Sequence, residues 1–147
     1  YDGNNNRTVY TDPANRSTRY AYDAFNRLVQ VTDAQTGVTR YGYDRNGNLI
    51  SLTDANGNET GFRYDDFGRL LSQSAPDTGT TLYSFDAASN LVEKMDARGL
   101  VTSCEYDAEN RLTAMRFGDP SRDIVYTYDE GPIPWGRTKQ EAPLAGV

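Results

Sequence analysis

The 147-residue sequence contains no histidine and a single cysteine, Cys104. The lack of histidine excludes Ser-His-Asp and Cys-His catalytic triads and His-ligated zinc. One cysteine excludes an internal disulfide and a Cys-ligated metal cluster. Basic residues number 15 against 21 acidic ones, and the net charge of −6 argues against nucleic-acid binding and against a polybasic membrane-surface segment. No apolar run approaches the roughly 18 residues that a membrane-spanning helix needs.

Aliphatic residues are scarce, whereas aromatic residues are not. Leu, Ile, Val and Phe together number only 26, but there are 11 Tyr, 5 Phe and 1 Trp. Disordered chains are poor in aromatic residues, so the chain is expected to fold. Asp, Asn and Gly, which favour turns, and Thr, which favours strands, are abundant. The composition favours an all-β fold whose buried surface is built largely from tyrosine.

An aromatic residue followed by aspartate recurs along almost the whole chain. The pairs are Tyr1-Asp2, Tyr22-Asp23, Tyr43-Asp44, Tyr64-Asp65, Phe85-Asp86, Tyr106-Asp107 and Tyr128-Asp129, spaced by 21 residues five times and then by 22. Two positions before the aromatic lies a second apolar residue: Tyr20, Tyr41, Phe62, Tyr83, Cys104 and Tyr126. Side chains two residues apart lie on one face of a β-strand, so each pair predicts a strand.

The residues after each aspartate also repeat. The third residue after the aspartate is Asn26, Gly47, Gly68, Ser89 or Asn110. The fourth is Arg27, Asn48, Arg69, Asn90 or Arg111. The fifth is always leucine: Leu28, Leu49, Leu70, Leu91 and Leu112. Gly and Asn tolerate positive φ, and an aspartate side chain can accept turn N–H groups, so a hairpin turn is predicted here. These repeated positions, from Tyr20 to Asp129, are predicted to be structural.

A second strand is predicted after each leucine: 28–32, 49–53 and 91–95. Turns rich in Asp, Ala, Asn and Gly then follow at 33–37, 54–57, 75–79 and 96–99. The predicted fold is all-β, with antiparallel hairpins of 21-residue period forming one long sheet of about a dozen strands over residues 1–129. Residues 130–147, rich in Pro and Gly and without a period, are predicted to be an irregular tail.

The segments Tyr41-Gly-Tyr-Asp-Arg-Asn-Gly-Asn-Leu49 and Phe62-Arg-Tyr-Asp-Asp-Phe-Gly-Arg-Leu70 resemble the signature of the YD-repeat, or Rhs-repeat, family. The resemblance covers residues 1 to about 130. It implies a curved, spiralling sheet of the kind found in bacterial Rhs toxins, the YD subunits of insecticidal toxin complexes and animal teneurins. Bacterial members enclose a C-terminal toxin.

The same resemblance implies that this chain is a fragment, about six repeats long, of a larger secreted or surface-delivered bacterial protein. Its partners would be the rest of the parent shell and the toxin cargo. Asp119-Pro120-Ser121-Arg122 begins like the Asp-Pro-x-Gly cleavage motif of bacterial members, but its position predicts an ordinary turn between repeats.

Several features of the sequence resemble chemical sites. The runs 44–48 and 54–58 resemble fragments of calcium loops but lack the Glu of an EF-hand, so turns without metal are expected. Cys104 occupies a Tyr or Phe position and is expected to be a small, buried apolar substitute. Arg27, Arg69 and Arg111 are expected to pair with aspartates of neighbouring repeats. Because the carboxylates recur in every repeat, no catalytic, cofactor or metal site is expected.

Two functions from different classes remain open. The first is structural: a wall segment that encloses or displays a toxin or effector. The second is an extracellular binding module in which the aromatic sheet surface recognises a glycan or a partner protein; a cleft with an aromatic floor would favour it. Open sheet edges also predict self-association.

Overall fold

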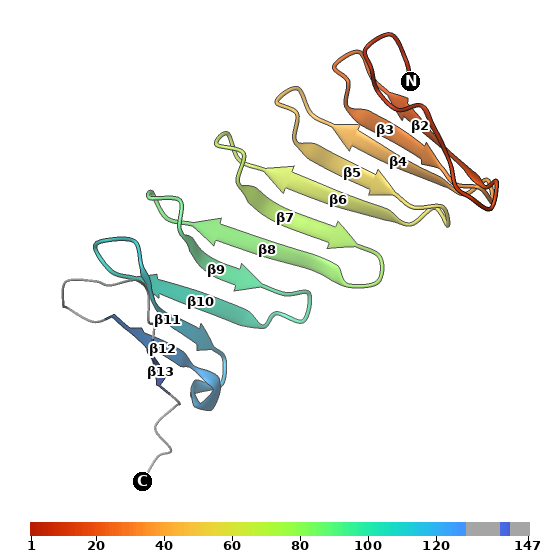
Figure 1. The fold of residues 1–147 in the computed structure, drawn as a ribbon. Helices are drawn as coiled ribbons and strands as arrows, with labels where there is room; N and C mark the ends of the chain where they lie inside the picture. Colours follow the sequence, from red (N-terminus) through yellow and green to blue (C-terminus); the bar gives the residue numbers. More distant parts are fainter. Residues whose placement is uncertain (129–138, 142–147) are drawn as a thin grey trace. The chain divides into compact units, whose positions relative to one another are not determined.

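The computed structural model describes residues 1–128 and 139–141, which are almost entirely strands and short turns (Figure 1). The chain divides into two compact units, Tyr1–Gly79 and Thr80–Val147. The predicted all-β fold of antiparallel hairpins is confirmed; within the described residues, the single helix is a 3₁₀ turn at Pro120–Arg122. No helix among these residues is long and apolar enough to cross a membrane.

The first unit contains the strands β1 to β7, which lie in chain order and pair with their neighbours antiparallel. Their bounds are Val9–Thr11 (β1), Ser17–Tyr22 (β2), Leu28–Thr32 (β3), Val38–Tyr43 (β4), Leu49–Thr53 (β5), Glu59–Tyr64 (β6) and Leu70–Ala75 (β7). The predicted second strands at 28–32 and 49–53 are therefore confirmed to the residue.

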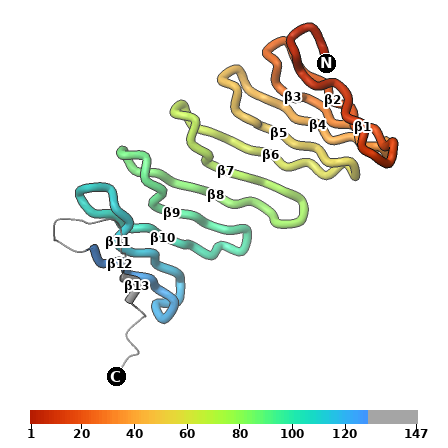
Figure 2. The backbone as a smooth tube through the Cα atoms, viewed as in Figure 1, coloured from red at the N-terminus to blue at the C-terminus, as the bar shows by residue number. Residues whose placement is uncertain are grey.

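The second unit repeats this design with β8 to β13. The bounds are Gly79–Phe85 (β8), Leu91–Met95 (β9), Val101–Tyr106 (β10), Leu112–Phe117 (β11), Ile124–Thr127 (β12) and Lys139–Glu141 (β13). The backbone trace shows the short turns alternating between the two ends of the strands (Figure 2). The turns that follow the aromatic-Asp pairs, hereafter the Tyr-Asp turns, lie at one end, and the alternate turns lie at the other.

Every repeat carries a β-bulge at the same place. Ala21 pairs with Gln30, but the next residue, Tyr22, pairs with Leu28, so Val29 is the extra residue. The same shift recurs at Tyr43, Tyr64, Phe85 and Tyr106. A bulge bends its strand and increases the local twist, so a regular bend is built into each hairpin.

The apolar face of the sheet is only half-buried. In the described part of the chain, the one buried side chain is Ala114, at 2% exposure. The repeated tyrosines are half-buried and lie opposite aliphatic residues of the next strand; Tyr20 faces Val31, for example, and Tyr41 faces Leu52. Tyrosine suits such a layer because its ring is apolar and its hydroxyl can reach a polar partner.

Three details differ from the sequence-based expectations. Cys104 is half-buried opposite Met115 rather than buried, because its position lies on this thin layer. Asp119-Pro120 forms the start of the 3₁₀ turn, capped by the Asp119 side chain, and not an ordinary inter-repeat turn. Strand β13 lies within the segment 130–147 and pairs with β12; Asp129 lies outside the described residues.

Candidate functional site

Both kinds of turn share one five-residue design that begins with aspartate. The backbone N–H of the aspartate donates to the carbonyl of the fifth residue at 2.9–3.0 Å, and the N–H of the fourth residue donates back to the aspartate carbonyl at 2.9–3.2 Å. The ten turns begin at Asp2, Asp12, Asp23, Asp33, Asp44, Asp54, Asp65, Asp86, Asp96 and Asp107. Each turn therefore closes a small ring of backbone hydrogen bonds.

The aspartate carboxylate fills the middle of this ring. One oxygen of Asp44 accepts the backbone N–H groups of Asn46 and Asn48, both at 2.9 Å, and the other accepts the Asn48 side chain at 2.9 Å. In the Asp65 turn, Arg69 replaces Asn48, and its Nε donates at 2.6 Å. The predicted role of the aspartate as an acceptor of turn N–H groups is confirmed.

These hydrogen bonds favour the charged form of the carboxyl groups. The Asn48 side chain is the largest cause that holds the pKa of Asp44 below its ordinary value, and the Asn58 side chain does the same for Asp54. For Asp23 the largest cause is the backbone N–H of Arg27. A carboxylate that accepts several N–H groups resists protonation.

The fourth turn position adopts a positive φ, as predicted. The values are 61° at Asn26, 88° at Gly47, 76° at Gly68, 68° at Ser89 and 61° at Asn110. Sequence reasoning missed that the alternate turns are built identically. The signal was available, because turn aspartates alternate at spacings of 10 and 11 residues from Asp2 to Asp107, with a single interruption at Ala75.

In four repeats, a tyrosine hydroxyl joins the hairpin to the one before it. The Tyr43 hydroxyl donates to the carbonyl of Leu28 at 2.9 Å, 15 residues earlier in the chain. Equivalent bonds run from Tyr22 to Arg7 at 3.2 Å, from Tyr106 to Leu91 at 3.0 Å and from Tyr128 to Leu112 at 2.8 Å. The aromatic and leucine positions singled out in the sequence are thus brought together across repeats.

The arginines pair with aspartate differently from the expectation. Arg27, Arg69 and Arg111 each form an ion pair with the aspartate of their own turn, four residues earlier, instead of the expected pair between repeats. Four residues separate the first and fifth turn positions, which the closed turn places side by side. Arg27 reaches the next repeat by other means: it donates to the Asp44 carbonyl at 3.0 Å, and its guanidinium lies 4.7 Å from the Tyr43 ring centroid.

Asparagine supplies a second link between neighbouring Tyr-Asp turns. The side-chain NH₂ of Asn90 donates to Asp86 in its own turn at 3.0 Å and to Asn110 in the next turn at 2.8 Å. Asn6 bridges Asp2 and Asn26 in the same way. Along the chain, the fifth turn position alternates as Asn6, Arg27, Asn48, Arg69, Asn90 and Arg111. The residue type at this position therefore alternates between Asn and Arg and repeats every 42 residues.

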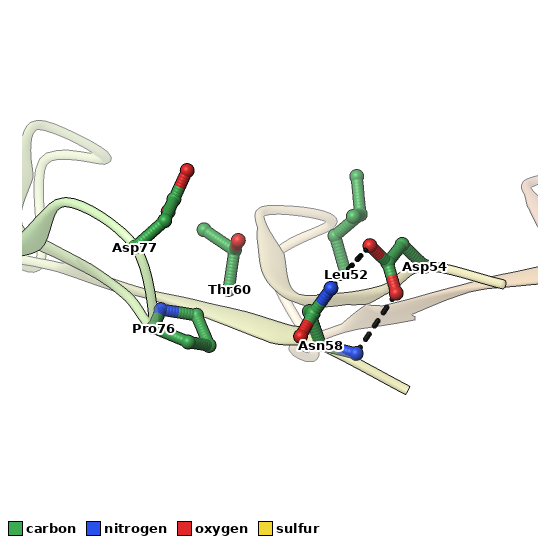
Figure 3. A pocket seen from close by; sticks show the side chains of 6 residues that line it. All are labelled: Leu52, Asp54, Asn58, Thr60, Pro76 and Asp77. Carbon is green, nitrogen blue, oxygen red and sulfur yellow. Dashed lines mark hydrogen bonds between the residues drawn. The ribbon is translucent and has the colours of Figure 1, made fainter. Parts of the chain in front are cut away.

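Three grooves lie along the alternate turns, also 42 residues apart. The first includes Tyr10, Asp12 and Thr18, the second Leu52, Asp54 and Thr60, and the third Lys94, Asp96 and Thr102. Figure 3 shows the second, where Asn58 donates twice to Asp54 while Pro76 and Asp77 form the opposite side. This groove has no aromatic floor, so it lacks the feature expected of a sugar-binding cleft.

The turn carboxylates accept N–H donors of their own turns, as at Asp44. In the described residues, no group of three or more Asp, Glu or Cys side chains is placed to hold a metal ion. What this arrangement can do chemically is hold each turn rigid and tie it to the next.

Comparison with known proteins agrees with this design. The RHS repeat family model matches residues 1–38, 22–59, 43–80, 64–95 and 85–119. Similar folds occur in a structure of the Photorhabdus luminescens Tc holotoxin pore (21% identity, TM-score 0.62, 77% of this chain and 6% of that one) and in one of TcdB2-TccC3-Cdc42 (22% identity, TM-score 0.63, 78% and 6%). This chain thus spans only about 6% of these relatives. No curated protein sequence matches it.

Proposed function

Because the chain belongs to the RHS repeat family, we propose that it is a non-catalytic wall segment of a longer secreted or surface-delivered bacterial protein, which encloses or displays a toxin. The observation that carries this proposal is the repetition of the contacts themselves. The turn aspartates, the tyrosine hydroxyls and the Asn and Arg links recur with the period of the fold. A wall needs such evenly distributed contacts, whereas an active site needs one singular constellation of groups.

The proposed partners are the remaining repeats of the parent protein and the enclosed toxin. The solved structures of similar fold support this choice, since they are toxin-complex proteins far longer than this chain. A second proposed partner is another copy of this chain, which would pair through the edge strands of the sheet. Light scattering of the chain across a salt series tests it: particle mass should grow as salt screens the net charge of −6, and a strictly monomeric chain would contradict it.

Limited proteolysis of the full-length parent protein tests the wall function. Weakening the wall with Asp65→Ala and Tyr43→Phe together should expose the downstream segment to protease several-fold faster. The matched control is Asp66→Ala with Tyr41→Phe, which changes the same residue types at positions that make no side-chain hydrogen bond within the described chain. Equal cleavage of wild type and both variants would contradict enclosure.

A second candidate function, glycan or protein binding, is favoured by one observation. Phe25 and Phe67 occupy the same turn position two repeats apart and are 78% and 84% exposed. Each ring packs against the arginine of its own turn, at 5.3 and 5.2 Å. Glycan-array binding that disappears in the Phe25→Ala and Phe67→Ala double variant would favour the binding module. Binding that is unchanged in that variant would exclude these rings as its site.

A further inference from the structure

The three grooves along the alternate turns provide an internal comparison, because the repeat places equivalent residues in each. The third groove differs from the others in charge. Lys94 stands where the first two grooves have Tyr10 and Leu52. Arg98 has no charged counterpart at the equivalent positions, Ala14 and Asn56.

A third cation comes from a segment without counterpart in the other grooves. Arg122 ends the 3₁₀ turn Pro120–Arg122, which takes the place of the ordinary five-residue turn between β11 and β12. Its guanidinium lies 5.8 Å from the Phe117 ring centroid, and Phe117 also lines the groove. A feature that appears once in a repeating structure is not required by the repeat itself, so a separate role is the natural explanation.

The two carboxylates of this groove are already engaged. Asp96 accepts the backbone N–H groups of Arg98 and Leu100 and the Arg98 guanidinium, at 2.7–3.0 Å. Asp119 accepts the N–H and hydroxyl of Ser121. The Lys94 side chain, by contrast, makes no hydrogen bond or ion pair with any residue that the structure describes, and Arg122 is exposed beside the Phe117 ring. Lys94, Arg98 and Arg122 thus outnumber the two carboxylates of the groove, Asp96 and Asp119, on a chain whose net charge is −6.

Apolar side chains line the same groove. Leu100 is 52% exposed and Val101 is 38% exposed, and both line the groove together with Phe117. Exposed aliphatic side chains suit another aliphatic side chain, whereas a sugar would need a flat aromatic floor and converging polar groups. The ligand that fits both features carries a carboxylate next to an apolar group.

We propose that the third groove binds an acidic peptide segment. A peptide carboxylate would lie between Lys94 and Arg122, and the neighbouring apolar side chain would cover Leu100 and Val101. Charge complementarity selects the peptide, and the apolar contact distinguishes it from a free anion. The second groove, with Leu52 in place of Lys94 and with Asp77 on its rim, is the matched site that should not bind it.

Nuclear magnetic resonance titration of the ¹⁵N-labelled 147-residue chain tests the proposal. The probe is the capped peptide Gly-Asp-Leu-Glu-Gly, and its control is the same peptide with Asn and Gln replacing Asp and Glu. The acidic peptide should shift the amide signals of Leu100, Val101 and Thr102 and leave those of Asn58 and Thr60 unchanged. Equal shifts with the neutral peptide, or in both grooves, would overturn the proposal.

Substitution then tests the residues. Lys94→Leu with Arg122→Gln should weaken binding roughly three- to tenfold, as expected for two exposed ion pairs. The control, Arg45→Gln with Arg63→Gln, removes the same charge elsewhere and should leave the affinity unchanged. An equal loss of affinity in both double variants would show that net charge, and not this groove, determines binding. Sodium acetate that binds as tightly as the peptide, or N-acetylneuraminic acid that binds more tightly, would exclude a peptide as the ligand.

Discussion

At the residue scale, aspartate carries most of the turn chemistry in this chain. Its carboxylate accepts two backbone N–H groups of its own turn, which would otherwise need water. Where the fifth residue is Asn or Arg, as at Asn48 and Arg69, the second oxygen also holds that side chain in place. Such hydrogen bonds to a charged acceptor are stronger than neutral ones. Because little apolar surface is buried, these local bonds have more influence on stability here than they would in a compact domain.

The adjacent pair Asp65 and Asp66 allows a direct test. Asp65 accepts from the backbone of Phe67 and Arg69 at 2.9 Å and from the Arg69 Nε at 2.6 Å, whereas Asp66 is exposed and makes no hydrogen bond within the described chain. Asp65→Ala should therefore lower the melting temperature by about 3–6 °C. Asp66→Ala, measured by the same thermal circular dichroism, should change it little. Equal effects would contradict the turn assignment.

Gly68 offers a substitution that completes a missing link. Asn6 and Asn90 each donate to an asparagine of the following turn, but Asn48 faces Gly68, which has no side chain. Gly68 has φ of 76°, close to the values that Asn26 and Asn110 adopt at the same position. Gly68→Asn should therefore keep or raise the melting temperature, because its side-chain NH₂ can donate to the Oδ1 of Asn48, which lies 3.7 Å from the Cβ position at residue 68.

The control for this link is Gly68→Ala, which imposes the same backbone demand without a side-chain amide to donate. Alanine with positive φ should lower the free energy of unfolding by about 1–2 kcal/mol. If alanine and asparagine destabilise the protein equally, the proposed hydrogen bond does not form.

At the scale of elements, the tyrosine hydroxyl fixes the distance between successive hairpins. Tyr43→Phe removes the hydrogen bond to the Leu28 carbonyl and should lower the free energy of unfolding, measured with urea, by about 0.5–1.5 kcal/mol. Tyr41→Phe is the matched control, since the Tyr41 hydroxyl makes no hydrogen bond within the described chain. A loss as large at Tyr41 would mean that ring packing, and not the hydroxyl, determines the effect.

The elements also show what could be predicted from the sequence. Strand positions, turn residues and positive φ at Asn26 and Gly47 followed from a strict period, because local chemistry alone determines them. The bulge at Val29 and the bond from Tyr43 to Leu28 could not be predicted, since both depend on register between strands. The predicted partner of Arg27, an aspartate of a neighbouring repeat, was wrong for a related reason. Spacing along the chain did not show that the closed turn places Arg27 beside Asp23.

The three grooves could not be predicted from the sequence for a different reason. They are formed by side chains from turns and strands of neighbouring repeats, and their 42-residue spacing is visible only once equivalent positions are compared in pairs of repeats. Curvature and spiralling of the sheet remain predictions.

At the scale of the whole molecule, removal of divalent metal should leave stability unchanged. The Asp-Asn-Gly turns resemble calcium loops, but the oxygens of Asp44 and Asp54 already accept N–H groups of their own turns. The melting temperature with and without EDTA measures this. A clear decrease that calcium reverses would show that metal ions, and not N–H donors, organise these turns.

The recurrence of one turn also predicts how the molecule responds to acid. The pKa values of Asp2, Asp12, Asp23, Asp44, Asp54, Asp65, Asp96 and Asp107 all lie below their ordinary value. A group with a lowered native pKa stabilises the fold fully above its unfolded-state pKa, near 3.9, and loses this contribution as the pH falls through the native value.

With no histidine in the chain, nothing comparable titrates between pH 5 and 7. The melting temperature should therefore be constant between about pH 7 and 5 and decrease steeply below about pH 4, as all these carboxylates take up protons over one narrow range. Asp54→Asn keeps an acceptor oxygen for the backbone but removes one titrating group, so it should make the acid decrease shallower while changing stability at pH 7 less than Asp54→Ala. A decrease that begins above pH 5, or one that Asp54→Asn leaves unchanged, would show that groups other than the turn carboxylates determine the acid response.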